Sequence, residues 1–243
     1  LKPVIAHTLS GGLRGKLATR RIHWNVSPYY ARVDNDILRV FTGGSSQGYF
    51  ANIPRTLRKG VDVGFGGQTG KLEWQVDYSY TDATYGAAFE EQSADNSSAD
   101  PDGVIRVRSG DRMPGVPRNV LTLAAEYKLT PAWSVGGNLR AYSGRYAAGD
   151  ENNRDRHGQI PGYAVVDLDL HYRPTRQLSF FFKLENALDR HYFVSGQLSD
   201  NVFDTPERLI DTRGPGTSTL FVAPGAPRGW FIGLRYDFAE AGR

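Results

Sequence analysis

The chain has 243 residues, 40% of them hydrophobic and 12% aromatic, and a net charge of +3 from 29 Lys and Arg against 26 Asp and Glu. The absence of cysteine excludes a disulfide scaffold, a thiolate metal site and a cysteine nucleophile. The small charge surplus does not indicate a nucleic-acid partner. No apolar run exceeds four residues, which excludes transmembrane helices and favours a soluble protein. A transmembrane β-barrel also lacks such runs, because its strands are apolar only at alternate positions.

The first quarter of the chain predicts three extended segments. Residues 8–13 read as the end of one strand. Residues 20–41 read as a longer strand, in which Pro28 indicates a bulge or turn. Residues 55–65 place Leu57, Val61, Val63 and Phe65 on one face.

Six further segments alternate with a period of two. Leu72, Trp74 and Val76, for example, fall on one face of their segment, and Glu73 and Gln75 on the other. No long segment repeats with the helical period. The six segments are residues 71–80, 120–129, 133–142, 164–172, 178–185 and 230–238. We therefore expect about nine strands, each with one apolar and one polar face.

The connections between these segments alternate in length. Those at residues 66–70, 128–131 and 173–176 are tight turns, whereas those at 42–54, 84–117, 147–159 and 191–228 are long and polar. Outer-membrane barrels have short periplasmic turns and long extracellular loops. The pattern favours a barrel, with a β-sandwich as the alternative.

Several stretches in the C-terminal half carry a resemblance. They are Ile-Pro-Gly-Tyr-Ala-Val-Val-Asp-Leu at 160–168, Leu-Glu-Asn-Ala-Leu-Asp-Arg-His-Tyr at 184–192, Pro-Gly-Ala-Pro-Arg-Gly-Trp at 224–230 and Gly-Leu-Arg-Tyr-Asp-Phe at 233–238. Together they resemble the C-terminal signature of TonB-dependent outer-membrane receptors. Residues 52–56, 59–62 and 78–83 also resemble segments of that family.

The resemblance implies an all-β, transmembrane antiparallel β-barrel. Family members enclose a globular plug in a barrel of 22 strands. The nine strands expected here would be about the last nine, with residues 1–243 a single partial domain and the plug and TonB box missing. The start at Leu1, without an initiator Met or signal peptide, also predicts a processed or truncated chain.

The implied function is TonB-dependent uptake of a scarce nutrient across the outer membrane of a Gram-negative bacterium. The implied cargo is a ferric siderophore or another iron complex, with no resident cofactor and no catalysis. Implied partners are outer-membrane lipid, a small-molecule ligand, the TonB complex acting through the plug, and the barrel-assembly machinery. That machinery would read Gly233, Tyr236 and Phe238, although residues 239–243 follow the final aromatic residue. A complete small barrel acting as a passive channel or adhesin is the alternative.

Candidate ligand-binding residues come from the loops. Cationic side chains suit the carboxylates or phosphates of ferric chelates. The candidates are Arg145, Tyr146, Arg154, Arg156, His157 and His191.

Polar residues that alternate with the apolar ones predict a wet interior with inward ion pairs, some of them in contact with the plug. These residues are Arg58, Asp62, Glu73, Asp77, Glu126, Lys128, Asn138, Arg140, Asp167, Asp169, Lys183, Glu185, Arg235 and Asp237.

Other motifs lack the context that their chemistry needs. Ser46 lies in a G-x-S-x-G sequence, but no helix-forming segment follows, so a flexible loop tip is favoured over a barrel enzyme. The five His residues form no zinc signature. An acidic cluster is interpreted as a solvated loop rather than a calcium site; it consists of Glu90, Glu91, Asp95, Asp100 and Asp102.

Overall fold

The computed structural model describes residues 1–17, 21–41, 48–201, 203–205, 208–209 and 217–238, and these contain strands and turns but no helix. None of them therefore forms a helix long and apolar enough to cross a membrane. Ten strands form one antiparallel sheet: β1 (Ile5–Ser10), β2 (Leu13–Leu17), β3 (Ile22–Phe41), β4 (Gly48–Thr69), β5 (Leu72–Tyr85), β8 (Asn119–Lys128), β9 (Trp133–Tyr142), β10 (Tyr163–Tyr172), β11 (Leu178–Glu185) and β16 (Gly229–Tyr236). A β-sandwich is therefore wrong, and the barrel-type sheet is confirmed.

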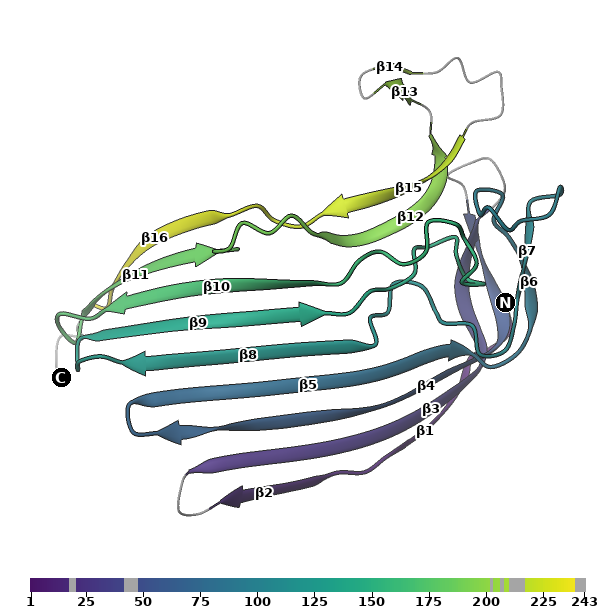
Figure 1. Ribbon diagram of the computed structural model, residues 1–243. Helices are drawn as coiled ribbons and strands as arrows, with labels where there is room; N and C mark the ends of the chain where they lie inside the picture. The colour runs from purple at the N-terminus through teal and green to yellow at the C-terminus, as the bar shows by residue number, and fades with distance from the viewer. Residues whose placement is uncertain (18–20, 42–47, 202, 206–207, 210–216, 239–243) are drawn as a thin grey trace.

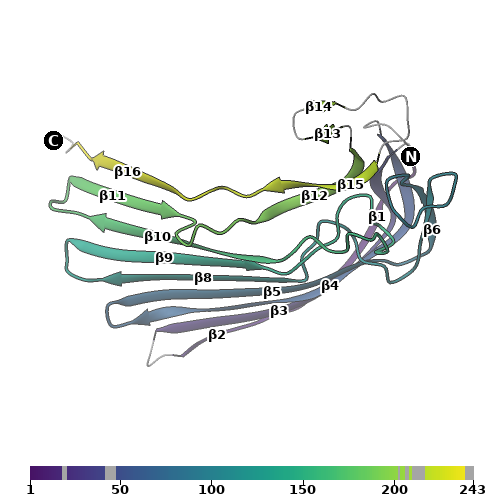
Figure 2. The ribbon, with the colours of Figure 1, turned by 45° about the horizontal axis from the view of Figure 1, so that its top comes forward.

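The sheet is a curved, open wall (Figures 1 and 2). Its order is β1-β3-β4-β5-β8-β9-β10-β11-β16, with β2 also paired to β3. Among the described residues no ladder joins β1 or β2 to β16, so these strands are the two edges. A complete small barrel would need that ladder, because a barrel has no edges.

The break between β1 and β2 follows from Pro28. Both strands pair with β3 in one continuous register, in which Ser10 lies opposite Tyr29 and Leu13 opposite Val26. Between them, Gly11 N–H donates to the Pro28 carbonyl at 3.2 Å, but Pro28 has no N–H to return. The predicted irregularity therefore falls in the neighbouring strand, while β3 itself continues through Pro28. Counted as one interrupted strand, β1 and β2 bring the wall to nine strands.

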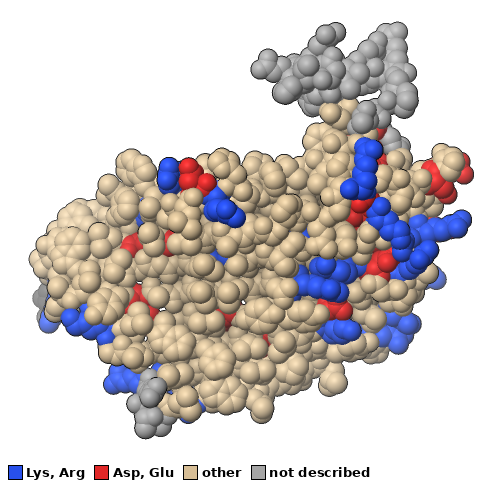
Figure 3. All heavy atoms as spheres, viewed as in Figure 1, with Lys and Arg blue, Asp and Glu red and all other residues tan. Residues whose placement is uncertain are grey.

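The outer face of the wall is apolar and exposed, as the alternation predicts. Opposed pairs such as Phe65 and Val76, or Leu123 and Leu139, share this face through the ladders. Figure 3 shows a face with few charged side chains over the middle of the strands and more of them toward the ends. Exposed apolar residues on it are Phe65, Tyr127, Val135, Leu168, Phe182 and Ile232. Such a surface suits contact with lipid.

The expected inward residues share the opposite face. The register places Glu73 opposite Glu126, and Asp169 opposite Lys183. The expected ion pairs are present in part: Arg140 Nη2 lies 2.8 Å from Asp167 Oδ2, Lys183 Nζ 2.6 Å from Glu185 Oε1, and Arg235 Nε 2.9 Å from Asp237 Oδ1.

Two of the long connections carry strands of their own, which their lack of periodicity concealed. Residues 84–117 contain the hairpin of β6 (Phe89–Gln92) and β7 (Val104–Val107). Residues 191–228 contain β12 (Phe193–Asn201) paired with β15 (Thr217–Pro224), and β13 (Phe203–Thr205) paired with β14 (Arg208–Leu209). Residues 48–54, expected in a loop, belong to β4.

A small hydrophobic core packs between the β6–β7 hairpin and the wall. Its buried members are Ile53, Ala83, Tyr85, Ile105, Val107 and Met113. The solvated-loop interpretation is therefore wrong for Glu91, which is only 5% exposed, whereas Asp100 and Asp102 are exposed as expected. Glu90 next to it projects outward, with a side chain 66% exposed.

Three of the stretches that carry the family resemblance meet at Asn186. Its backbone N–H donates to Asp167 Oδ1 at 2.9 Å, and its side-chain amide donates to the carbonyls of Arg190 and Ala226 at 2.9 and 3.2 Å. Asn186 is 2% exposed with a φ of 48°, a left-handed conformation that Asn tolerates. The motifs thus fix where β10, β11 and the start of β16 meet.

The expected assembly signal lies at the end of β16. Gly233 is opposite Phe181, whose ring covers it, so a Cβ at this position would overlap the ring. The rings of Tyr236 and Phe238 meet edge to face at 4.9 Å.

Candidate ligand-binding site in the long loops

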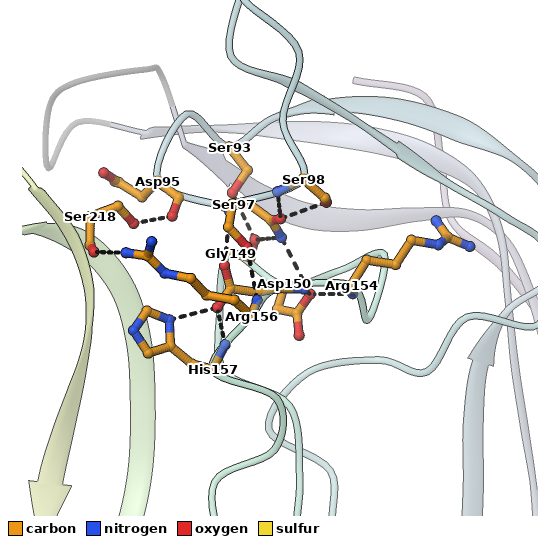
Figure 4. Close-up of polar contacts among 12 residues, drawn as sticks. Ser93, Asp95, Ser97, Ser98, Gly149, Asp150, Arg154, Arg156, His157 and Ser218 are labelled. Atoms are coloured by element: carbon orange, nitrogen blue, oxygen red, sulfur yellow. Dashed lines mark hydrogen bonds and ion pairs between the residues drawn. The ribbon is translucent and has the colours of Figure 1, made fainter.

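The long connections converge at one end of the wall. The segment after β9 turns back on itself, where Arg145 pairs with Ile160, and then joins β12. There Leu198 N–H donates to the Ala148 carbonyl at 2.8 Å, and Ala148 N–H to the Gly196 carbonyl at 3.0 Å. We call the contact region of residues 93–98, 148–157, 198–200 and 218 the loop junction (Figure 4).

Asp150 organises the centre of the loop junction. Its Oδ1 accepts the backbone N–H groups of Arg154 and Asp155 at 2.8 and 2.9 Å, which closes a turn typical of aspartate. Gly149 precedes it with a φ of 93°, where a side chain would be strained. Burial raises the pKa of Asp150, and these hydrogen bonds only partly offset it.

Asn96 and Ser93 bind this turn to the β6–β7 connection. Asn96 Nδ2 donates to the Gly149 carbonyl at 2.9 Å and lies 3.2 Å from Asn152 Oδ1, and Ser93 Oγ donates to the same carbonyl at 2.7 Å. These buried side chains therefore hold two loops together.

Asp155 orients His157. The carboxylate accepts His157 N–H at 2.9 Å, lies 2.7 Å from Nδ1 of the ring, and accepts Ser97 N–H at 2.8 Å. Burial acts to raise the pKa of Asp155, but the hydrogen bonds from Ser97 and His157 outweigh it and lower that pKa. The ionised carboxylate thus fixes the orientation of the His157 ring through Nδ1.

Arg154 and Arg156 flank the junction and are both exposed. Arg156 Nη2 donates to the Ser218 carbonyl at 3.1 Å, and Arg154 Nη1 to the Arg106 carbonyl at 3.2 Å. Figure 4 shows the two guanidinium groups extending in opposite directions. Each retains free N–H donors, because a guanidinium carries five.

Arg145 and Tyr146 occupy different surroundings. Arg145 is only 4% exposed; Nη2 donates to the Phe193 carbonyl at 2.8 Å, and the guanidinium lies 5.7 Å from the Tyr163 ring centre. Tyr146 is half-buried beneath Arg112, whose guanidinium carbon lies 5.5 Å from the ring centre. Both residues support the base of the loops.

His191 is exposed in the segment between β11 and β12. In the part of the chain that the structure describes, no hydrogen bond or ion pair joins it to the other five candidates. Arg154, Arg156 and His157 thus share one loop, but the two guanidinium groups point apart, and His191 lies in a separate segment. No group of three or more His, Asp or Glu among the described residues could hold a metal ion. Ser46 lies outside the described residues.

The junction also contains residues that the sequence did not reveal as partners. Asp95 and Asp200, about a hundred positions apart, share a hydrogen bond, and burial followed by this contact raises the pKa of Asp95 to about 6. Ser218 Oγ donates to the Asp95 carbonyl. Irregular loops have no periodicity, so only tertiary structure reveals such pairs.

An open antiparallel sheet with an apolar outer face, a charged inner face and ordered loops at one end is part of an outer-membrane β-barrel. Residues 1–187 match the family described as TonB dependent receptor-like, beta-barrel, and the chain belongs to this family. TonB-dependent receptors are outer-membrane proteins of Gram-negative bacteria, and they are receptors and transporters rather than enzymes. The resemblance seen in the sequence is thereby confirmed.

Several relatives show how far the likeness extends. A probable TonB-dependent siderophore receptor, PiuA of Acinetobacter baumannii, is 23% identical over 181 residues, which cover 73% of this chain and 22% of that protein. Its crystal structure matches with a TM-score of 0.67 at 16% identity, over 95% of this chain and 28% of that one. The structure of the ferric-catecholate import receptor Fiu of E. coli K12 matches with a TM-score of 0.63 at 21% identity. The match covers 96% of this chain and 27% of that one.

The copper transporter OprC matches with a TM-score of 0.68 at 19% identity, over 98% of this chain and 32% of that one. The fold is thus shared by receptors named for different cargoes. The chain spans about a quarter of the length of these relatives, from 22% to 32%.

Proposed function

We propose that the chain forms part of the wall and of the extracellular loops of a receptor for TonB-dependent uptake of a ferric siderophore or another iron complex. The single observation that carries this proposal is the loop junction, where loops distant in sequence are held together and present exposed Arg154 and Arg156. Residues 1–243 would act as one partial domain of that receptor.

The chemistry of the junction favours an anionic cargo. Arg154 and Arg156 keep free N–H donors beyond their bonds to the carbonyls of Arg106 and Ser218. Guanidinium groups suit the oxygen-rich anions of ferric chelates. Arg145 and Tyr146 would then position the loops, and His191 would contact cargo only from its separate segment.

The remaining partners follow from the family. The TonB complex would act through a plug domain, with part of the charged inner face in contact with the plug. Outer-membrane lipid would cover the apolar face, and the barrel-assembly machinery would read Gly233, Tyr236 and Phe238. The chain itself would make or break no bond in the cargo.

Uptake of radioactive iron by cells that express the full-length receptor tests the proposal. Iron is supplied as catecholate, hydroxamate and citrate complexes, with and without TonB. We expect TonB-dependent uptake of at least one complex, and about a thirtyfold weaker apparent affinity in Arg154→Gln/Arg156→Gln, since each of the two charged hydrogen bonds contributes about 1 kcal/mol.

The matched control is Arg173→Gln/Arg176→Gln, which removes two charges from a short turn at the opposite end of the wall. Normal affinity in the loop variant would contradict the assigned site. Absence of TonB-dependent uptake for every iron complex would contradict the assigned cargo.

A further inference from the structure

Three buried carboxylate oxygens in the loops have no hydrogen-bond partner among the residues that the structure describes. They are Oε2 of Glu91, Oδ2 of Asp150 and Oε2 of Glu151. All three residues are more than nine-tenths buried. A buried carboxylate normally has its oxygens hydrogen-bonded, paired with a cation or bound to a metal ion. These three oxygens therefore indicate a missing partner at this place in the loops.

One hydrogen bond between the loops fixes where Glu91 and Glu151 lie. Ser93 Oγ donates to the Gly149 carbonyl at 2.7 Å (Figure 4). Ser93 continues the ladder of β6, since its N–H donates to the Gly103 carbonyl at 2.8 Å. Glu91, two positions before Ser93, therefore shares its face of the strand. Glu151, two positions after Gly149, accepts the Gly149 N–H through Oε1. The two glutamates thus flank the same contact, one from each loop.

The surroundings of the two glutamates are apolar and provide no positive charge. Glu91 lies opposite Ile105 in the β6–β7 ladder, and Ile105 is fully buried. Burial raises the pKa of Glu91, and the charge of Glu151 raises it further. In the part of the chain that the structure describes, no Lys, Arg or His charge acts on either glutamate. Two carboxylates held together in such a place need either protons or a cation.

We propose that the loops bind one Ca²⁺ ion between Glu91 and Glu151, which ties the β6–β7 hairpin to the turn of the loop junction. The double positive charge of the ion balances the two carboxylates, and carboxylate oxygens are ligands that Ca²⁺ prefers. Asp150 adds negative charge nearby. It is not a third ligand, because no group of three acidic or His side chains within the described ranges could hold an ion. Backbone oxygens and water complete the coordination of Ca²⁺ in such sites.

The available ligands favour Ca²⁺ over the other common divalent ions. Zn²⁺ prefers sulfur and imidazole ligands, but the chain has no Cys, and the two residues here are glutamates. Mg²⁺ requires a regular octahedron and keeps several water molecules, whereas both glutamates are buried. Ca²⁺ accepts about 6–8 oxygens in an irregular arrangement, which suits two carboxylates contributed by separate loops.

The ion makes closure of the loops depend on Ca²⁺ at the outer surface of the cell. Glu151 belongs to the turn in which Asp150 accepts the Arg154 N–H, so the ion also holds the backbone that carries Arg154. This inference goes beyond the proposed uptake and does not depend on the identity of the cargo.

The test is hydrogen exchange of the full-length receptor near neutral pH, with Ca²⁺ or with a chelator. Opening of residues 84–117 and 147–159 should become about a hundredfold rarer at a Ca²⁺ concentration of about 100 times Kd, because only the closed loops hold both ligands. Glu91→Gln and Glu151→Gln should each lose most of this effect. Both substitutions relieve the repulsion, so the loops of these variants should stay closed in the chelator, which separates loss of the ion from loss of the fold.

Glu90→Gln is the matched control, because this neighbouring side chain is 66% exposed. It should respond to Ca²⁺ as the wild type does. Calorimetric titration with Ca²⁺ should show one bound equivalent fewer in Glu91→Gln than in the wild type or in Glu90→Gln. The same number of equivalents in Glu91→Gln and the wild type would overturn the proposal, as would an equal response of the loops to Mg²⁺. Calcium binding without uptake of any iron complex would refute only the proposed cargo.

Discussion

Glu91 and Glu151 form a buried acidic pair whose protonation should control how firmly the loops are held. Glu91, in β6, is 5% exposed, and Glu151, beside the turn of Asp150, is 8% exposed. Glu151 Oε1 accepts Gly149 N–H at 3.0 Å, but Oε2 of each residue has no hydrogen-bond partner. Burial and then mutual repulsion raise the pKa of Glu91 to about 8, and burial raises the pKa of Glu151 to about 7.

The sign of the pH dependence follows from these values. Below about pH 4.5 the carboxyls are protonated in both the closed and the opened loops, and the pair contributes no difference. As the pH rises, the opened state loses its protons first, so the closed state becomes less favourable until about pH 8. At about 1.4 kcal/mol per pH unit, the loss for Glu91 alone is on the order of 5 kcal/mol.

Hydrogen exchange of backbone amides in residues 84–117 and 147–159 measures the free energy of loop opening. We expect it to fall between pH 6 and 8 in the wild type, after correction for intrinsic exchange. In Glu91→Gln, which stays neutral, the fall should be much smaller and the loops more protected at pH 8.5.

Glu90→Gln is the matched control, because Glu90 precedes Glu91 but its side chain is 66% exposed. It should keep the wild-type pH dependence. If Glu91→Gln also kept the full wild-type slope, the assignment of this titration to the buried pair would be refuted.

Three further predictions concern packing and the inner network. Ile105→Ala should lower the stability of the β6–β7 hairpin by about 2–5 kcal/mol, measured by hydrogen exchange, because Ile105 is fully buried. Gly233→Val should cost about 1–3 kcal/mol and reduce the heat-modifiable folded fraction on electrophoresis; adding Phe181→Ala should restore it by removing the overlapping ring. Asp167→Asn loses the ion pair with Arg140 but keeps an acceptor for the Asn186 N–H, so it should cost about 1 kcal/mol in denaturant unfolding, and Asp167→Ala about 2–3.

The strands of the wall could be predicted from the sequence because one face of the sheet contacts lipid and the other faces polar surroundings. Residues 133–142 and 178–185, expected as strands, coincide with β9 and β11. Lipid outside and polar surroundings inside impose a period of two on every strand, and this pattern is local in the sequence. Periodicity could not reveal the β6–β7 hairpin. Its side chains are buried by the wall and by a second loop, and both are distant in the sequence.

The loop contacts join segments that are far apart in the chain. Local composition therefore predicted the wrong exposure for individual residues. Glu91 belongs to an acidic run that looks solvated, but Glu151 lies against it from another connection. Arg145 has the sequence features of an exposed loop cation, but Phe193 and Tyr163 cover it. No local pattern separates such residues from Arg154, which is exposed.

The family resemblance and the proposed cargo site lie in different parts of the molecule. Asn186 needs a left-handed backbone, two amide donors and a side-chain acceptor in one place, and few residue types supply all three. This requirement makes the surrounding motifs recognisable in the sequence, but they lie in the frame of the barrel. The barrel frame imposes no comparable requirement on the loop junction, because the residues of the junction contact other loop residues. The motifs that identify the family therefore carry no information about the loop junction, and the contacts proposed for Arg154, Arg156 and His157 need a test of their own.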